Sequence, residues 1–130
     1  MEAGKPLTAA NLRYLLALRR LSGGVGAGVR SVRVAEELGL TKSSVHTMFR
    51  SFQAMGLIRK DAYGSAFFTP AGRALADRYY RYFQAARGLL AARVPPGAGL
   101  DDAACALLAT LSQESLEHLC RERGRPVWKG

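Results

Sequence analysis

The sequence predicts a mainly helical chain with one small β-hairpin, and three observations lead to this prediction. Apolar residues recur at intervals of three and four over most of the 130 residues, as they do along one side of an α-helix. Clusters of glycine and proline separate these periodic stretches. Only residues 57–61 and 66–69 form short runs on either side of a turn sequence, Ala62-Tyr-Gly-Ser65, which is typical of two antiparallel strands.

The first two expected helices have clear start and stop signals. Thr8 can cap a helix that runs to about Leu21, where the glycine-rich segment 22–28 stops it. Ser31 can cap a short second helix, which ends at Gly39 because glycine readily adopts the left-handed backbone of a helix end.

A third helix begins at Thr41 and ends at Gly56. Its apolar residues recur with the period of an α-helix and are expected to face the core: Val45, Met48, Phe49, Phe52 and Met55. The same period places polar and basic side chains together on the opposite face: Ser43, His46, Thr47 and Arg50. This helix is therefore expected to have one buried side and one polar side.

Three more helices are expected after the hairpin. They cover residues 70–93, 103–111 and 113–123. Each has a candidate N-cap: Thr69, then Asp101 or Asp102, then Ser112. Pro70 fits the first position of the long helix, where its missing N–H costs nothing.

Basic residues are concentrated in the first two thirds of the chain. The chain has 19 Lys and Arg against 10 Asp and Glu, a formal net charge of +9. Residues 1–82 hold 13 of the basic and 5 of the acidic residues, whereas residues 83–130 hold 6 and 5. A solvated basic surface would account for the charge alone. An excess this one-sided also suits a polyanionic partner, of which nucleic acid is the commonest.

The sequence argues against several other classes of protein. No apolar run is long enough to cross a bilayer and no secretory signal precedes the first helix, so we expect a cytoplasmic protein without membrane contact. Cys105 and Cys120 lie too far apart for a structural zinc clip. No catalytic or nucleotide-binding motif is present, so neither an enzyme nor a cofactor is expected.

The order helix, helix, tight turn, helix, hairpin is that of a winged helix-turn-helix, whose third helix enters the major groove of DNA while the hairpin lies along the backbone. Short donors and cations at the start of this helix and on the hairpin are the candidate DNA-binding residues: Thr41, Lys42, Ser43, Ser44, His46, Thr47, Arg50, Arg59, Lys60 and Tyr63. Helix capping alone would equally explain Thr41 and Ser44, and His46 fits a plain exposed position as well as a DNA contact. Lys42 and Arg50 would also suit solvated surface charges.

Residues 34–58 resemble the diphtheria-toxin-repressor family of metal-dependent transcriptional regulators, particularly its short manganese-responsive branch. The resemblance rests on the short sequence motifs Ser43-Ser-Val45 and Met55-Gly-Leu-Ile58, followed by Tyr63-Gly64 and Phe68-Thr-Pro-Ala-Gly72. A looser resemblance extends through the long helix and residues 101–119. The first two motifs also occur in winged helices of the multiple-antibiotic-resistance type, which is the second structural candidate.

The resemblance implies a metal site that this sequence does not keep. The family binds its metal with acidic residues on the first helix, a histidine on the long helix, and a cysteine or glutamate followed by Glu-His on the next. These positions fall on Asn11, Tyr14, Phe83, Cys105, Leu108 and Ala109. Only Cys105 keeps a ligand type, that of the iron branch, and its alternative is a small buried apolar residue. We therefore expect apolar packing in place of the metal.

The domain organisation expected is a winged helix-turn-helix DNA-binding domain over residues 1–70, a C-terminal helical dimerisation region over 71–124, and a tail over 125–130. The helix over 103–111 is apolar on nearly all sides in a small protein, so part of it is expected to face a second copy. The candidate interface residues are Ala103, Ala104, Leu107 and Leu111.

The sequence thus predicts a homodimeric regulator of transcription, a repressor in the simplest case, that binds specific double-stranded DNA without the family's metal. Two alternatives stay open. The first is a winged-helix protein-interaction module. The second is a regulator of the multiple-antibiotic-resistance type, controlled by a small ligand or by thiol oxidation.

Overall fold

The structure is a computed structural model that describes residues 7–23, 26–97 and 99–122. The described residues form helices and strands in the order α1 (Ala9–Ser22), α2 (Ser31–Leu38), α3 (Lys42–Ala54), β1 (Ile58–Lys60), β2 (Ala66–Phe68), α4 (Pro70–Ala91), α5 (Leu100–Thr110) and α6 (Gln113–Arg121). This is the mainly helical fold with a small hairpin that the sequence predicts, and it is a winged helix-turn-helix. None of the described helices is both long and apolar enough to cross a membrane.

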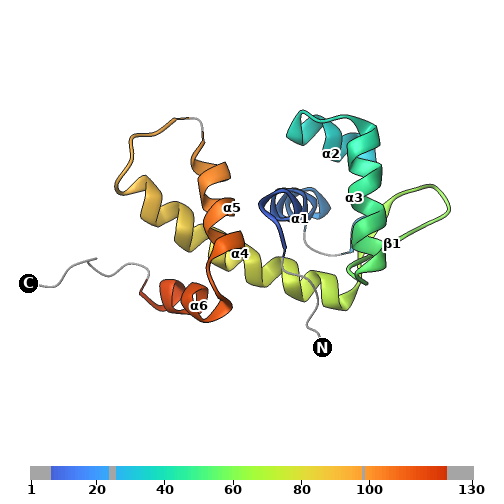
Figure 1. Cartoon of the computed structure of the whole chain (residues 1–130). Helices are drawn as coiled ribbons and strands as arrows, with labels where there is room; N and C mark the ends of the chain where they lie inside the picture. The colour runs from blue at the N-terminus through green and yellow to red at the C-terminus, as the bar shows by residue number, and fades with distance from the viewer. Residues whose placement is uncertain (1–6, 24–25, 98, 123–130) are drawn as a thin grey trace, which may run out of the picture.

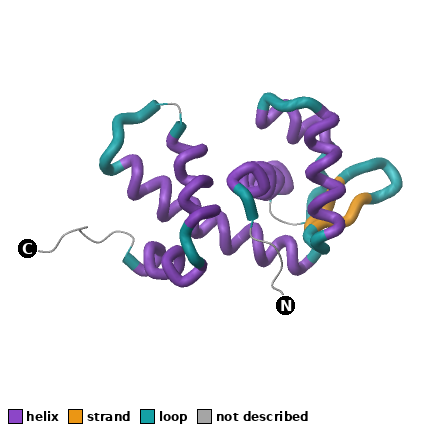
Figure 2. The backbone as a smooth tube through the Cα atoms, viewed as in Figure 1, coloured by secondary structure: helices purple, strands orange, loops and turns teal. Residues whose placement is uncertain are grey.

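The helix α4 runs along the length of the molecule and connects its two halves (Figure 1). At one end lie α2, α3 and the hairpin, and at the other lie α5 and α6 (Figure 2). The helix α1 lies between these groups and packs against α2, α4 and α5. The winged helix-turn-helix and the C-terminal helices are therefore joined through both α1 and α4.

The core is centred on α1, whose residues are buried on most sides. Leu12 and Leu15 are completely buried, and they belong to one apolar cluster with Val45, Phe49 and Phe52 of α3. Burying each such side chain contributes roughly 1.5–3 kcal/mol. The apolar stripe expected on α3 is confirmed at these three positions. The expectation is wrong for Met55, which caps the helix end and is exposed.

Most of the expected helix starts are confirmed because the cap is a local interaction. The hydroxyl oxygen of Thr8 accepts the N–H of Asn11, and that of Ser112 accepts the N–H of Ser115. The expected caps of two other helices are wrong: the N-cap positions of α2 and α5 are Arg30 and Gly99, and neither makes a side-chain capping hydrogen bond.

Ser31 lies inside α2 as its first residue and is buried, because its hydroxyl faces α3. The helix α5 begins at Leu100, before both aspartates that were expected to cap it. Gly99 takes the cap position with φ of +103°. Asp101 and Asp102 lie in the first turn, where carboxylates favour the positive end of the helix dipole.

The hairpin pairs Ile58 with Phe68 and Lys60 with Ala66 in antiparallel register. Val29, from the segment between α1 and α2, adds a bridge to the outer side of β2, with its N–H and C=O both bonded to Ala66 at 2.9 and 2.8 Å. This third pairing, which the sequence did not predict, fixes the hairpin against the start of α2.

The hairpin is also fixed to α4 through backbone contact. A Cβ atom added to Gly72 would lie 1.9 Å from the carbonyl oxygen of Leu57, so only glycine fits there. The Thr69 hydroxyl donates to the Gly56 carbonyl at 2.7 Å and accepts the N–H of Gly72 at 3.0 Å. Hairpin and α4 therefore meet in one defined orientation.

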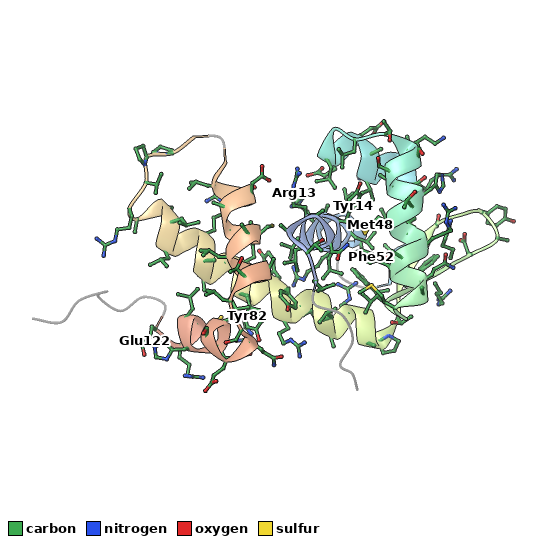
Figure 3. The ribbon with its side chains drawn as sticks, viewed as in Figure 1. Arg13, Tyr14, Met48, Phe52, Tyr82 and Glu122 are labelled. Atoms are coloured by element: carbon green, nitrogen blue, oxygen red, sulfur yellow. The ribbon has the colours of Figure 1, made fainter. Side chains whose placement is uncertain are left out.

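Side-chain contacts attach α6 to the middle of α4. Tyr82 is completely buried, and its hydroxyl donates to Glu117 of α6 at 2.6 Å (Figure 3). Burial, followed by this hydrogen bond, raises the pKa of Tyr82 to about 12. Hydrogen bonds from Tyr82 and then Arg81 lower the pKa of the Glu117 carboxyl. The contact is thus a neutral phenol bonded to a charged carboxylate.

Candidate nucleic-acid interface

The start of α3 presents exposed donors and a cation to solvent. Lys42, Ser43 and Ser44 are all exposed in its first turn. The Thr41 hydroxyl accepts the N–H of Ser44 at 3.1 Å and donates to the Ser44 hydroxyl at 3.0 Å. Capping therefore occupies Thr41, while the remaining free N–H groups of the first turn point outward with the positive end of the helix dipole, an arrangement that suits phosphate.

One turn further along, Thr47 and Arg50 share the exposed side of α3. The Thr47 hydroxyl donates to the Ser43 carbonyl at 3.1 Å, which leaves its methyl group free for an apolar contact. Among the described residues, no hydrogen bond or ion pair involves the guanidinium of Arg50. Methyl and guanidinium are the groups that read thymine and guanine in the major groove.

His46 differs from its neighbours because it is half-buried. Its Nε2 lies 3.4 Å from the hydroxyl oxygen of Ser31 in α2. The ring therefore joins the two helices of the helix-turn-helix. A packing role thus accounts for His46 in the structure.

The hairpin carries its cations on aromatic rings. The guanidinium carbon of Arg59 lies 4.9 Å from the centre of the Phe67 ring, and Lys60 Nζ lies 6.0 Å from that of Phe49. Such contacts hold a long side chain in place while its charge stays at the surface.

At the tip of the hairpin, Tyr63 is 81% exposed. The Asp61 carboxylate accepts the N–H groups of Tyr63 and Ser65, both at 2.9 Å. Gly64 completes the turn with φ of +84°. The loop that projects Tyr63 is therefore built by its own hydrogen bonds.

Two exposed cations at the start of α2 were not predicted from the sequence as candidate contacts. Arg30 occupies the N-cap position of α2, and Arg33 lies in its first turn. Arg30 is adjacent both to Val29, which pairs with the hairpin, and to Ser31, which contacts His46. These contacts join residues that are distant in the sequence. The excess of basic residues was therefore the only sequence signal for Arg30 and Arg33.

The positions that correspond to the family's metal ligands do not assemble a donor set. Asn11 accepts the N–H of Thr8 at 3.0 Å, and its amide nitrogen lies 3.2 Å from Met48 Sδ. Tyr14 and Leu108 are buried in the apolar core. Phe83 and Ala109 are half-buried and have hydrocarbon side chains. Within the described ranges, no three His, Cys, Asp or Glu residues lie close enough to hold an ion.

Cys105 is the one position of that set with a ligand type, and it is buried. Burial raises the pKa of its thiol to about 11, although Arg13 acts in the opposite direction. At neutral pH the group is a thiol, whereas metals bind the thiolate. The residues present therefore do not fit a divalent transition metal.

The expected interface residues of α5 are separated by the fold. Ala104 is completely buried within the chain, so the expectation that it contacts a second copy is wrong. Leu107 is half-buried, Ala103 is exposed, and Leu111 is 37% exposed at the helix end. The part of the expected interface that stays accessible is thus the side of α5 that carries these three residues.

The comparisons with known proteins agree with this architecture. Residues 12–62 match the IclR helix-turn-helix domain. A hypothetical protein of Sulfolobus solfataricus, SSo2273, superimposes with a TM-score of 0.64 at 19% identity, over 94% of this chain and 93% of its own. No curated protein matches the chain.

Two solved regulators have similar structures. The IdeR of T. acidophilum has a TM-score of 0.68 at 17% identity over 95% of this chain, and the manganese regulator SloR has 0.69 at 20% identity over 95%. The chain spans 56% of the length of each. At these identities the likeness shows the fold. Together with the helix-turn-helix match, it supports a winged-helix, DNA-binding regulator of transcription.

Proposed function

We propose that the protein is a homodimeric repressor that binds specific double-stranded DNA through α3 and the hairpin. Residues 1–70 would form the DNA-binding domain and residues 71–124 the linking helix and dimerisation region. The proposed tail, 125–130, lies outside the described residues. The DNA contacts would come from the ten residues predicted from the sequence, with His46 also holding α2 against α3.

The observation that carries this proposal is the exposed side of α3. Thr47 offers a methyl group and Arg50 a guanidinium without a partner among the described residues, one turn apart. A helix face that only supports the fold does not require these two exposed groups. Two cations held on aromatic rings, Arg59 and Lys60, flank it on the hairpin. This arrangement favours base reading by the helix and phosphate contact by the hairpin.

Dimerisation would follow from the exposed side of α5. A two-fold dimer would present two copies of α3 to successive major grooves, as a palindromic site requires. A dimer that covers a promoter hinders transcription by occupancy alone, so repression is the simplest outcome.

The proposal is tested by selecting duplexes from a random pool with the purified chain and measuring affinity against salt. The regulator should enrich a palindromic site and bind it at least a thousandfold more tightly than random duplex. The logarithm of the affinity should also fall steeply with the logarithm of salt. A protein-interaction module would enrich nothing and bind both duplexes negligibly, which would refute the proposal.

A further inference from the structure

The hairpin and the residues just before α2 together form a small three-stranded sheet. β1 pairs with β2, and Val29 pairs with Ala66 on the other edge of β2. Val29 and Ala66 are buried. Lys60 belongs to the same row of the sheet, and its Nζ lies 6.0 Å from the centre of the Phe49 ring in α3. One face of the sheet therefore points toward α3 and the core, and the opposite face points away from them.

Arg59, Phe67 and Arg30 lie on this opposite face, which we call the solvent face. Arg59 is paired with Phe67, and its guanidinium carbon lies 4.9 Å from the centre of that ring. Gly28 is the neighbour of Phe67 on the third strand, since a Cβ added there would lie 2.5 Å from Phe67 Cζ. Arg30 follows Gly28 by two residues in extended backbone, so its side chain points to the same face. A half-buried aromatic ring thus occupies the middle strand, with an exposed arginine on each outer strand.

The arginines of the solvent face have no acidic partner among the described residues. The ion pairs of the described chain all involve arginines of α1 and α4: Arg13, Arg19, Arg20, Arg81 and Arg87. Residues 28–33 and 57–68 together hold four basic residues and one acidic residue, Asp61. The Asp61 carboxylate already accepts the N–H groups of Tyr63 and Ser65. This surface therefore carries an excess of positive charge, which favours an anionic partner.

The position of the solvent face favours the DNA backbone as that partner. The dimensions of a β-sheet place the Cα atoms of Arg59 and Arg30 about 12 Å apart. Two guanidinium groups at this separation suit two phosphates of one strand, whose charges recur about every 3.4 Å along the helix axis. Arg30 also precedes Ser31, whose hydroxyl lies 3.4 Å from His46 of α3. The solvent face is therefore continuous with the surface that α3 presents, at the end of the molecule where the hairpin projects (Figure 1).

We propose that the solvent face binds the phosphate backbone of the DNA that flanks the base pairs read by α3. Arg30 and Arg59 make the contacts, and Phe67 supports Arg59. This inference rests on the proposed function and extends it, because Arg30 and the solvent face lie outside the contacts predicted from the sequence. Since the face points away from α3, the phosphates that it binds lie beyond the base pairs that Arg50 reads. Phosphate contacts raise affinity without adding sequence preference.

The test compares two duplexes: the shortest selected operator, and the same operator extended at each end by one helical turn of arbitrary sequence. Affinity is measured with the full chain by fluorescence anisotropy over a series of salt concentrations. Wild type should bind the extended duplex at least tenfold more tightly, whatever the flanking sequence, and with a steeper salt dependence. Equal affinity for the two duplexes overturns the flanking contact alone. Failure to bind either duplex overturns the proposed function and this inference with it.

Three variants assign the gain from the flanking DNA to the solvent face. Arg30→Gln should remove most of the gain and lower the salt slope of the extended duplex by about one unit per bound protomer. Arg59→Gln should act in the same way. Arg93→Gln is the matched control, because Arg93 is exposed in the turn after α4 and forms no ion pair among the described residues. It makes the same change of charge and should alter both affinities less than twofold.

Two further variants exclude other roles of Arg30. Arg30→Lys keeps the charge and should retain the gain within about twofold, whereas Arg50→Ala should weaken both duplexes alike and leave their ratio unchanged. The exposed Arg30 side chain bonds to no described residue, so Arg30→Gln should leave thermal unfolding unchanged. If Arg30→Gln weakened both duplexes by the same factor, the contact would not lie in the flanking DNA. If it changed neither, an acidic protein would be the better partner for this face, and either result overturns the proposal.

Discussion

The two ends of α4 are joined to their neighbours by different kinds of contact. At its start, the backbone of Gly72 packs directly against the backbone of Leu57, and the Thr69 hydroxyl ties the same junction together. In its second half, Tyr82 bonds to Glu117 of α6 and Arg87 to Asp101 of α5, both at 2.6 Å.

The two junctions differ in how closely their contacts fix the geometry. A backbone contact without side chains has one geometry. Surface ion pairs such as Arg87 with Asp101 contribute only about 0–1 kcal/mol each and can form in several orientations. We infer that backbone contact gives the hairpin a single geometry on α4, whereas α5 and α6 are held on α4 by side-chain packing and ion pairs, which adjust more readily.

Gly72→Ala should break the fixed junction. The added methyl group would lie within van der Waals radii of the Leu57 carbonyl, and neither backbone can move without displacing the hairpin. We expect a loss of about 1–3 kcal/mol or more in the free energy of unfolding, measured by urea denaturation.

Gly88→Ala is the matched control on the same helix. Nothing lies within 4 Å of a Cβ at this position, so alanine should stabilise the helix by about 0.5–1 kcal/mol. Equal stability of the two variants would show that the hairpin junction is as adjustable as the other end.

Leu111→Asp tests whether the adjustable half carries the association surface. Leu111 is partly exposed in the monomer, so the substitution leaves the core intact and places a charge in any interface. We expect the dimer dissociation constant to rise at least tenfold in analytical ultracentrifugation. Leu107→Asp should do the same but also lower stability, because Leu107 is half-buried.

Gln113→Asp serves as the control, because this exposed position in the first turn of α6 accepts an acidic residue. A wild type that sediments as a monomer at micromolar concentration would refute dimerisation.

Arg50→Ala tests whether the fixed half reads DNA. If the guanidinium bonds to a base, its loss should cost about 1–3 kcal/mol of affinity for the selected operator and little for random duplex. Lys60→Ala should instead weaken binding to all duplexes alike and reduce the salt slope by about one unit. Equal operator affinity of wild type and Arg50→Ala would remove α3 from the reading role.

Tyr82→Phe tests how much the hydrogen bond between Tyr82 and Glu117 stabilises the contact of α4 with α6. At neutral pH it removes the hydrogen bond to Glu117, for an expected loss of about 0.5–1.5 kcal/mol. The folded protein raises the pKa of Tyr82 from about 10 to about 12, so the folded state holds this proton more tightly than the unfolded state. The associated stability is complete below pH 10 and is lost as the pH rises through 12.

The difference in stability between wild type and Tyr82→Phe should therefore narrow between pH 10 and 12 in urea denaturation series. Parallel pH profiles would contradict the assignment, since they would mean that the Tyr82 phenol titrates at the same pH in both states.

The sequence predicted those features that depend on neighbouring residues. Thr8, Thr41, Thr69 and Ser112 cap the helices as expected, because each satisfies N–H groups three residues ahead. Ser31 has the same chemistry, but it is buried against His46 as the first residue of α2, and the N-cap residue Arg30 makes no side-chain capping hydrogen bond. A local signal was thus overridden by a partner fifteen residues away.

The features that the sequence did not reveal all depend on distant partners. Val29 pairs with Ala66 across the helix-turn-helix, and Arg13 reaches Asp102 near the other end of the chain. Ala104 belongs to a helix that is apolar on nearly every side. The spacing of apolar residues in its sequence therefore does not distinguish the buried side from the exposed side. Only the packing of α5 on α1 and α4 decides this.

The smallest expected effect is that of divalent metal ions on operator binding. In a metal-gated repressor, the ion shifts the population toward the DNA-competent arrangement because it binds that arrangement more tightly. Here Tyr14 and Leu108 are buried in the apolar core at the corresponding positions, and each fully buried side chain of this kind contributes roughly 1.5–3 kcal/mol without an ion. We therefore expect operator affinity in a chelator to equal that in excess manganese or ferrous iron within twofold, measured by fluorescence anisotropy. A tenfold gain with metal, abolished by Cys105→Ala, would instead mean that α1, α4 and α5 rearrange around an ion. The adjustable half would then be the half that senses the metal.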